Sequence, residues 1–171
     1  MSFISQVSSP PYGRVIAEGY GSIASPVSQI IVNDLLLPSI ELPANFLNEN
    51  YLLIESLIRR SALGFAPVGI TAMWAVADNP AMTSGQSICN ISIAATLNQG
   101  WRAFGVCWGT GTGLTVSTFQ SPGNQGANSF NDVARDPSGV LYIAPRITAG
   151  MDIGDIVQLT YYRVSAFPRS A

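Results

Sequence analysis

Short apolar runs, each ended by turn-forming residues, are the feature that most limits how this chain can fold. The runs are rich in Val, Ile, Thr and aromatic residues, and Gly, Pro, Asn and Asp separate them. Such runs are typical of β-strands, and turn signals at this frequency are typical of a sandwich or a barrel. We therefore predict strands over residues 29–37 (continuing at 40–42), 53–65, 68–77, 87–96, 101–108, 114–119, 140–147 and 156–167.

These runs give eight strand candidates and a single helical turn within residues 44–50. Eight antiparallel strands in two four-stranded sheets form a jelly roll. The predicted fold class is therefore all-β, an eight-stranded antiparallel jelly-roll β-sandwich. Beside the alternating Ile, Val and Leu positions, we expect its core to contain the large aromatic residues Trp74, Trp101, Phe104, Trp108 and Tyr142.

The predicted domain boundaries follow the change from turn-rich to strand-rich sequence. Residues 1–28, with Pro10-Pro11 and several glycines, are expected to form an extended N-terminal arm lying over the domain or a neighbouring subunit. Residues 29–168 form the jelly-roll domain and 169–171 a C-terminal tail. Residues 120–138 are polar and are predicted to form a functional or interface loop. Deleting residues 1–25 is expected to leave a folded domain.

The composition favours a protein that assembles with copies of itself. Charged residues make up 11% of the 171 residues, against about 25% in an average soluble protein. A surface with so few charges is expected to be covered in part by other copies. All eight basic residues are arginine, which interfaces prefer over lysine. A biased base composition of the gene would produce the same pattern.

The absence of histidine and lysine argues against an enzyme. It removes the usual general base, the Ser-His-Asp triad and Schiff-base chemistry. Close aspartate pairs remain, Asp132 with Asp136 and Asp152 with Asp155, and turn formation is their more frequent role. The same four carboxylates are the candidates for Ca²⁺ ligands, although no EF-hand spacing supports a metal site. No catalytic residue and no cofactor is predicted.

Three further features have ordinary structural interpretations. Cys89 and Cys107 lack metal-site spacing and are predicted to be buried free thiols in a reducing compartment. Residues 109–113, Gly-Thr-Gly-Thr-Gly, are predicted to be a hairpin turn, because a phosphate loop would require a lysine and a following helix. No apolar run approaches the roughly 18 residues that span a bilayer, and residues 1–5 do not resemble a signal peptide. A cytosolic location is expected.

A stretch in the first half of the chain resembles a known family. Residues 54–86, IESLIRRSALGFAPVGITAMWAVADNPAMTSGQ, are similar to the second and third strands of tymovirus (Tymoviridae) coat proteins. The residues that carry this resemblance are Ser56-Leu57, Pro67, Val68-Gly69, Trp74, Asn79-Pro80 and Gln86-Ser87-Ile88. Residues 39–45, 136–143 and 159–168 also resemble segments of that family, whereas residues 97–135 depart from its pattern.

The resemblance implies a coat protein of a small non-enveloped plant virus. Many copies would assemble into an icosahedral capsid, T=3 in that family, around a positive-strand RNA genome. The protein would be found in the virion, and in the host-cell cytoplasm before assembly, without a membrane partner. The family's histidine-linked RNA contacts have no counterpart, because this chain has no histidine. The alternative is a β-sandwich binding module, such as a lectin or a TNF-like trimer.

Arginine side chains are the candidates for contacts with RNA or with neighbouring subunits. With a net charge of −2 and no basic arm, polyamines or divalent cations would have to neutralise most RNA phosphates. Arg14 lies in the predicted arm, and Arg59 and Arg60 interrupt an apolar strand. Neighbours on a strand point to opposite faces, so one of this pair could face the particle interior while the other joins an interface. Either could instead be an edge-strand charge that blocks aggregation.

Overall fold

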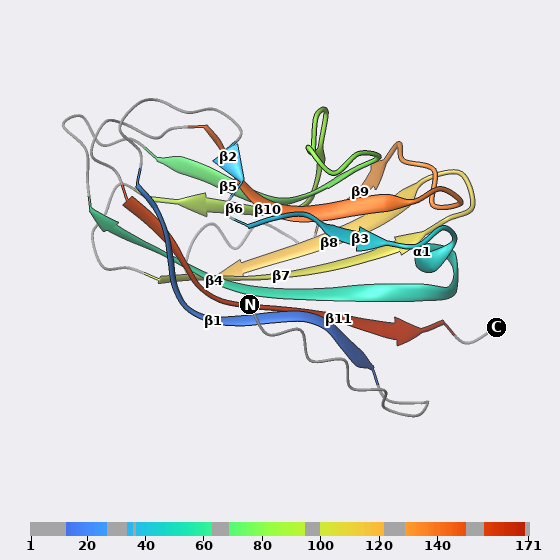
Figure 1. Ribbon diagram of the computed structural model, residues 1–171, viewed down its shortest axis with the longest axis horizontal. Coiled ribbons are helices and arrows are strands. Elements are labelled where there is room, and N and C mark those ends of the chain that lie inside the picture. The colour runs from blue at the N-terminus through green and yellow to red at the C-terminus, as the bar shows by residue number, and fades with distance from the viewer. Residues whose placement is uncertain are drawn as a thin grey trace.

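The computed structural model describes residues 13–26, 34–35, 37–62, 69–94, 100–121, 129–149 and 156–169. Two antiparallel sheets face each other as a β-sandwich (Figure 1). The first sheet has the strand order β1 (Arg14–Pro26), β11 (Ile156–Pro168), β4 (Asn50–Ala62), β7 (Gly100–Gly109), β8 (Leu114–Ser121) and β9 (Ser129–Val133). The second has the order β2 (Asp34–Leu35), β10 (Leu141–Ala149), β5 (Ile70–Ala77) and β6 (Gln86–Ile93), and β3 (Ile40–Leu42) also pairs with β10.

The strand pairs are nested along the chain. The first and last strands, β1 and β11, are paired, and inside them β3 pairs with β10. The next pair inward is β4 with β7, and the innermost is the hairpin of β5 and β6. Successive pairs belong alternately to the first and to the second sheet. Segments that are far apart in the sequence therefore lie side by side. The strands β8 and β9 extend the first sheet beyond β7 as an additional hairpin.

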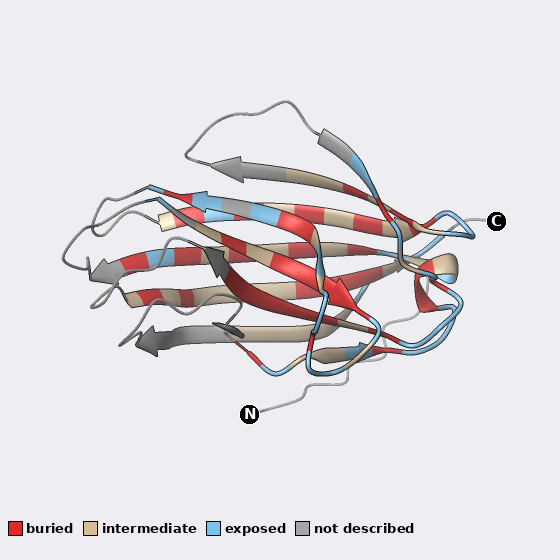
Figure 2. Cartoon of the chain, turned by 90° about the horizontal axis from the view of Figure 1, so that it is seen from above, coloured by how far each residue is buried: buried red, intermediate tan, exposed pale blue. Residues whose placement is uncertain are grey.

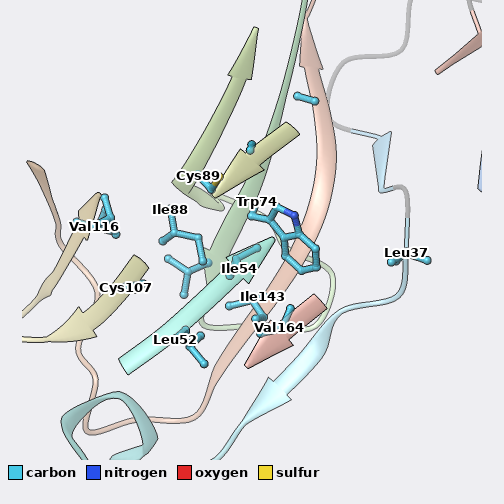
Figure 3. Close-up of a cluster of buried hydrophobic side chains, with 14 of the residues drawn as sticks. Leu37, Leu52, Ile54, Trp74, Ile88, Cys89, Cys107, Val116, Ile143 and Val164 are labelled. Atoms are coloured by element: carbon cyan, nitrogen blue, oxygen red, sulfur yellow. The ribbon is translucent and has the colours of Figure 1, made fainter. Parts of the chain in front are cut away.

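The core lies between the two sheets and follows the period-two alternation of the strands (Figure 2). In β4, for example, every second residue from Leu52 to Ile58 is buried, whereas the residues between them are only partly buried. Figure 3 shows Trp74 of β5 beside Ile54, Ile143 and Val164, which come from both sheets. The indole of Trp74 has no exposed surface. This tryptophan therefore joins the two sheets at the centre of the sandwich.

Three of the five aromatic residues predicted for the core face outward instead. Trp74 and Trp101 are buried as expected, but Phe104, Trp108 and Tyr142 are only partly buried. The reason is strand parity: Trp101 points inward, so every second residue after it does too, and positions 104 and 108 lie on the other face. The prediction that these three residues fill the core was wrong.

The predicted N-terminal arm contains a strand. Arg14 to Pro26 is extended, as expected, but it forms β1 and pairs with β11 from Ala166 to Ile156. The sequence did not indicate this strand because its glycines resemble turn signals. A Cβ at Gly19 would lie 2.4 Å from a ring carbon of Tyr162, so this glycine permits close packing rather than a turn. Residues 1–12 lie outside the described residues.

Most of the remaining element predictions match the structure, but the described residues contain eleven strands, in sheets of six and five, where the sequence predicted eight in two sheets of four. The difference arises because β1 and β9 were not predicted and the first predicted strand is divided into β2 and β3. The predicted helical turn is α1 (Phe46–Glu49), and Gly109 to Gly113 connects β7 to β8 as a hairpin with Thr110 N–H bonded to the Gly113 carbonyl at 2.8 Å. In the predicted loop, however, Ser129–Val133 forms β9. Of the strand predicted at 29–37, the described residues contain β2 and Leu37. No helix within the described ranges has the length and apolarity needed to cross a membrane.

Candidate functional site

The outer face of the six-stranded sheet carries a row of aromatic side chains at one end. The strand register places Tyr51 of β4 beside Trp108 of β7 on one side and Phe167 of β11 on the other. The rings of Tyr51 and Phe167 stack, with centroids 5.0 Å apart and planes 9° apart. We call these three residues the aromatic shelf. A shallow hollow of about 340 Å³ lies at the Tyr51 and Trp108 side of the shelf, and Val106 and Arg169 complete its lining.

Arg169 borders the shelf and is held there by backbone oxygens. Its guanidinium Nη1 donates to the carbonyl of Gly109 at 2.6 Å and to that of Asn48 at 3.4 Å. Its backbone N–H donates to the carbonyl of Glu49 at 2.8 Å. These bonds fix the end of β11 against α1 and against the β7–β8 turn. The hollow therefore combines aromatic faces with one positioned cation.

The three arginines predicted to contact RNA or subunits occupy different environments. Arg14 is exposed at the start of β1, with its guanidinium carbon 5.4 Å from the ring centroid of Phe46. Arg59 is exposed on the outer face of β4, and Arg60 is fully buried on the inner face. Arg60 Nη1 lies 3.5 Å from the carbonyl oxygen of Ala94. Arg14 and Arg59 are thus the two whose side chains reach the surface of the described fold.

These arginines do not form one site. In the strand register, Arg14 of β1 lies beside Ala166 of β11, and Ala166 lies beside Leu52 of β4. Arg59 is seven positions further along β4 than Leu52. At about 3.3 Å per residue, that separation is roughly 23 Å. The opposite orientation of Arg59 and Arg60 agrees with the prediction from strand geometry. Their interpretation as edge-strand charges is wrong, because β4 lies between β11 and β7.

The aspartates considered as acid–base pairs or Ca²⁺ ligands have local partners. Asp132 accepts a hydrogen bond from the Thr115 hydroxyl at 3.0 Å, across the β8–β9 hairpin. Asp136 accepts one from the Ser138 backbone N–H at 2.8 Å, and hydrogen bonds from the side chain and backbone of Ser138 lower its pKa. Within the described residues, no three acidic or metal-binding side chains are grouped as a metal site. Asp152 and Asp155 lie outside these residues.

The turn between β5 and β6, residues 78–85, covers part of the outer face of the second sheet. Met82 of this turn is fully buried against three small residues, Ala75, Ala77 and Ala144. Two arginines hold the turn. Arg146 donates a hydrogen bond to the Met82 carbonyl at 2.8 Å. Arg135 forms an ion pair with Asp78 at 3.0 Å and donates a hydrogen bond to the Ser84 carbonyl. Sequence reasoning assigned no role to either arginine. This part of the second sheet's outer face is therefore packed against a turn of the same chain.

Both cysteines are buried, as the sequence predicted. A Cβ at Gly105 would lie 2.7 Å from the Cβ of Cys89, so β6 and β7 approach closely and exclude water around this thiol. Burial raises the pKa of Cys89 and of Cys107 to about 12. A thiol must be ionised to act as a nucleophile. At neutral pH neither side chain can serve as one.

The burial of the thiols gives a direct prediction for their reactivity. At pH 8 the native protein is expected to react negligibly with Ellman's reagent, because both thiols stay protonated and covered. In guanidinium chloride, where the fold is lost, the two cysteines should both react within minutes. The absorbance of the released thiolate measures this. Rapid reaction of one thiol in the native state would contradict the described packing.

Sequence reasoning missed the aromatic shelf. Tyr51, Trp108 and Phe167 lie 57 and 59 residues apart along the chain, and only the pairing of β4 with β7 and β11 brings them together. The period-two alternation of β7 was sufficient to predict that Trp108 and Trp101 lie on opposite faces of the sheet. It could not have shown which strands are neighbours.

Comparisons with known proteins give fold-level likeness alone. No family model matches the chain. No curated protein matches it either. Among solved structures, a Bauhinia forficata lectin in complex with GalNAc shares 10% identity at a TM-score of 0.45, covering 90% of this chain and 93% of that one. A Lotus tetragonolobus seed lectin shares 8% at a TM-score of 0.46, covering 90% and 94%.

A third similar structure is the CBM2 module of the evolved Dit of Lactobacillus casei BL23 phage J-1. It shares 11% identity at a TM-score of 0.43, and the alignment covers 78% of this chain and 70% of that one. Neither ligands nor functional residues are transferred from these proteins to the present chain.

Proposed function

We propose that this chain is a coat-protein subunit that assembles into a non-enveloped icosahedral shell around positive-strand RNA. The observation that carries the proposal is the nested strand pairing. Rolling up one long antiparallel ribbon pairs the first strand with the last, the second with the second last, and so on inward. The pairs β1–β11, β3–β10, β4–β7 and β5–β6 follow this rule. They support a jelly roll of eight principal strands, to which β8 and β9 add a hairpin.

Surface chemistry favours a shell subunit among the proteins that use jelly rolls, which include viral capsid and lectin domains. Only 11% of the residues are charged, and the basic ones are all arginine. Contacts between copies would cover such a surface, and a closed shell multiplies weak contacts by symmetry. The resemblance of residues 54–86 to tymovirus coat proteins supports the same conclusion and suggests a T=3 arrangement.

RNA packaging in this proposal relies on few protein charges. Arg14 and Arg59 are the two candidate arginines that reach the surface, and the net charge is −2. RNA phosphates that the protein does not neutralise must be neutralised by small cations. Most of them would therefore be neutralised by polyamines or divalent cations. Particle yield is expected to depend on these cations, whereas folding of the subunit is not.

Negative-stain electron microscopy of the purified full chain tests the proposal. We expect uniform spherical particles, and light scattering should give a mass that is a large multiple of 18.1 kDa. The ratio of absorbance at 260 and 280 nm on the same fraction reports packaged RNA. The experiment should cover a range of salt, spermidine and Ca²⁺ concentrations. Monomers or trimers under every condition would overturn the shell and favour the binding-module alternative.

A further inference from the structure

The outward positions of β4 and β7 form an apolar surface. In both strands the residues that alternate with the buried ones point away from the core. Six of these residues are apolar or aromatic and remain partly exposed: Tyr51, Leu53, Leu57, Phe104, Val106 and Trp108. We call this set the apolar face. A solvated outer face of a sheet normally carries polar side chains, and contiguous apolar surface indicates a contact with another molecule.

The apolar face has a polar border. Leu53 lies beside Val106 in the register of β4 and β7, and Val106 lies beside Ser117 of β8. Arg59, further along β4, is exposed on the same side of the sheet. An apolar centre within a polar rim is typical of protein–protein interfaces, where Tyr, Trp, Phe and Arg are also enriched. The arrangement therefore favours a protein partner.

The size of the surface suits a stable pair of subunits. From Tyr51 to Arg59, β4 is about 26 Å long at roughly 3.3 Å per residue, and the five strands from β1 to β8 in the sheet order are about 24 Å wide. Their flat projection is about 600 Å², and the accessible surface of the side chains is larger than that projection. A stable interface takes about 800 Å² from each partner. This part of the sheet is therefore large enough to hold two copies together.

Charges near the centre of this surface are balanced. Arg102 Nη2 lies 3.7 Å from Glu55 Oε1, and its guanidinium carbon is 4.8 Å from the ring centroid of Phe104. The strand register places Arg163 of β11 between Glu55 of β4 and Glu18 of β1. Two identical surfaces meet without strong repulsion when their charges balance in this way. RNA would instead require arginines that carboxylates leave unneutralised, so a second copy of the chain suits this surface better.

We propose that a second copy of this chain packs on the apolar face, so that the six-stranded sheets of two copies stack face to face. A contact between two identical surfaces is two-fold symmetric, and stacked sheets lie about 10 Å apart. Each copy would cover the Tyr51, Val106 and Trp108 side chains of the other. The pair goes beyond the proposed shell, because two copies can associate in this way whether or not the pairs assemble further.

A glutamate in the middle of the apolar face tests the pairing. In Val106→Glu each copy would bury a carboxylate without a partner, so the dissociation constant of the pair should rise about a hundredfold or more. The matched control is Val140→Glu, the same substitution at a valine that is 41% exposed and precedes β10 in the other sheet. Sedimentation equilibrium should give the full chain and the control twice the 18.1 kDa subunit mass at concentrations where Val106→Glu is a monomer.

Two further measurements keep the test independent of the folding of Val106→Glu. A Tyr51→Gln variant removes a ring that is 36% exposed in the subunit, and it should weaken pairing about tenfold while its circular dichroism stays that of the full chain. Acrylamide quenching reports chiefly on Trp108, because Trp74 and Trp101 are 0% and 2% exposed. Quenching should increase as the full chain is diluted to monomers.

The outcomes separate this pairing from the shell. Pairs of folded Val106→Glu or Tyr51→Gln as tight as those of the full chain would overturn the pairing, and spherical particles formed by these variants would leave the shell standing. Trp108 that stays protected in monomers would mean that the chain covers its own apolar face. Pairing that requires bound RNA, seen as a raised ratio of absorbance at 260 and 280 nm, would mean that RNA occupies it. Either result would overturn the proposal, whereas pairs that never form particles would support it and overturn the shell.

Discussion

A chain that lacks residues 1–26 is expected not to fold cooperatively. This deletion removes β1, which pairs with β11 along ten aligned positions and packs Ile16 and Ala17 against the core. Its loss would expose the backbone groups of β11 and uncover the partly buried ring of Tyr162. We expect stability to fall by more than about 5 kcal/mol, the lower limit for an ordinary domain. Far-ultraviolet circular dichroism and the soluble yield measure this.

A shorter deletion provides the control. A chain lacking residues 1–12 keeps all of β1 and should unfold cooperatively, with a midpoint close to that of the full chain. The sequence alone led to the opposite expectation, namely that residues 1–25 can be removed without loss of the fold. If the chain without residues 1–26 folds and unfolds like the full chain, the pairing of β1 with β11 contributes little, and the predicted arm is dispensable after all.

Replacing Trp74 with alanine is expected to destabilise the fold by about 3–5 kcal/mol, the usual cost of removing a large buried aromatic side chain. The indole is fully buried between the sheets, and its ring centroid lies 5.9 Å from that of Tyr162. Alanine would leave a cavity that both sheets border, and neither can move to fill it without breaking strand pairs. Urea unfolding followed by circular dichroism gives the change in the free energy of unfolding.

A Trp74→Phe variant is the matched control for this prediction. Phenylalanine keeps most of the volume and removes the indole N–H, for which the described residues provide no hydrogen-bond partner. A buried donor without a partner is itself costly, so this substitution should lose less than half of what alanine loses. Equal losses for the two variants would indicate that the indole N–H is bonded and important.

The sequence predicted the strands whose apolar runs are bounded by clear turns. The runs at β5 and β6, the hairpin at Gly109 to Gly113 and the turn at α1 all agree with the structure. The two missed strands have a common physical cause. In β1, a glycine is needed where Tyr162 packs closely, and in β9 the exposed positions Asn131 and Asp132 give an edge strand a polar composition. Local composition does not distinguish such strands from loops.

The candidate site was less predictable, because it depends on which strands are neighbours. Strand geometry placed Arg59 and Arg60 on opposite faces, but the pattern around them could not show that Arg60 points inward. Likewise, β7 has large apolar residues on both faces, so the choice between Trp101 and Trp108 for the core required the structure. Tertiary pairing, rather than any local signal, assembled the aromatic shelf.

The position of β11 determines when this protein can fold during its synthesis. This strand follows all the others along the chain described here, yet it lies between β1 and β4, second from the edge of the larger sheet. About 130 residues separate β1 from its partner, all of which the ribosome must release before the two strands can pair, and pairing over such sequence distances is slow. Until then the free edges of β1 and β4 are open to strands of other nascent chains. Where many ribosomes translate one message side by side, the rate of chain completion will control how much of the product is usable.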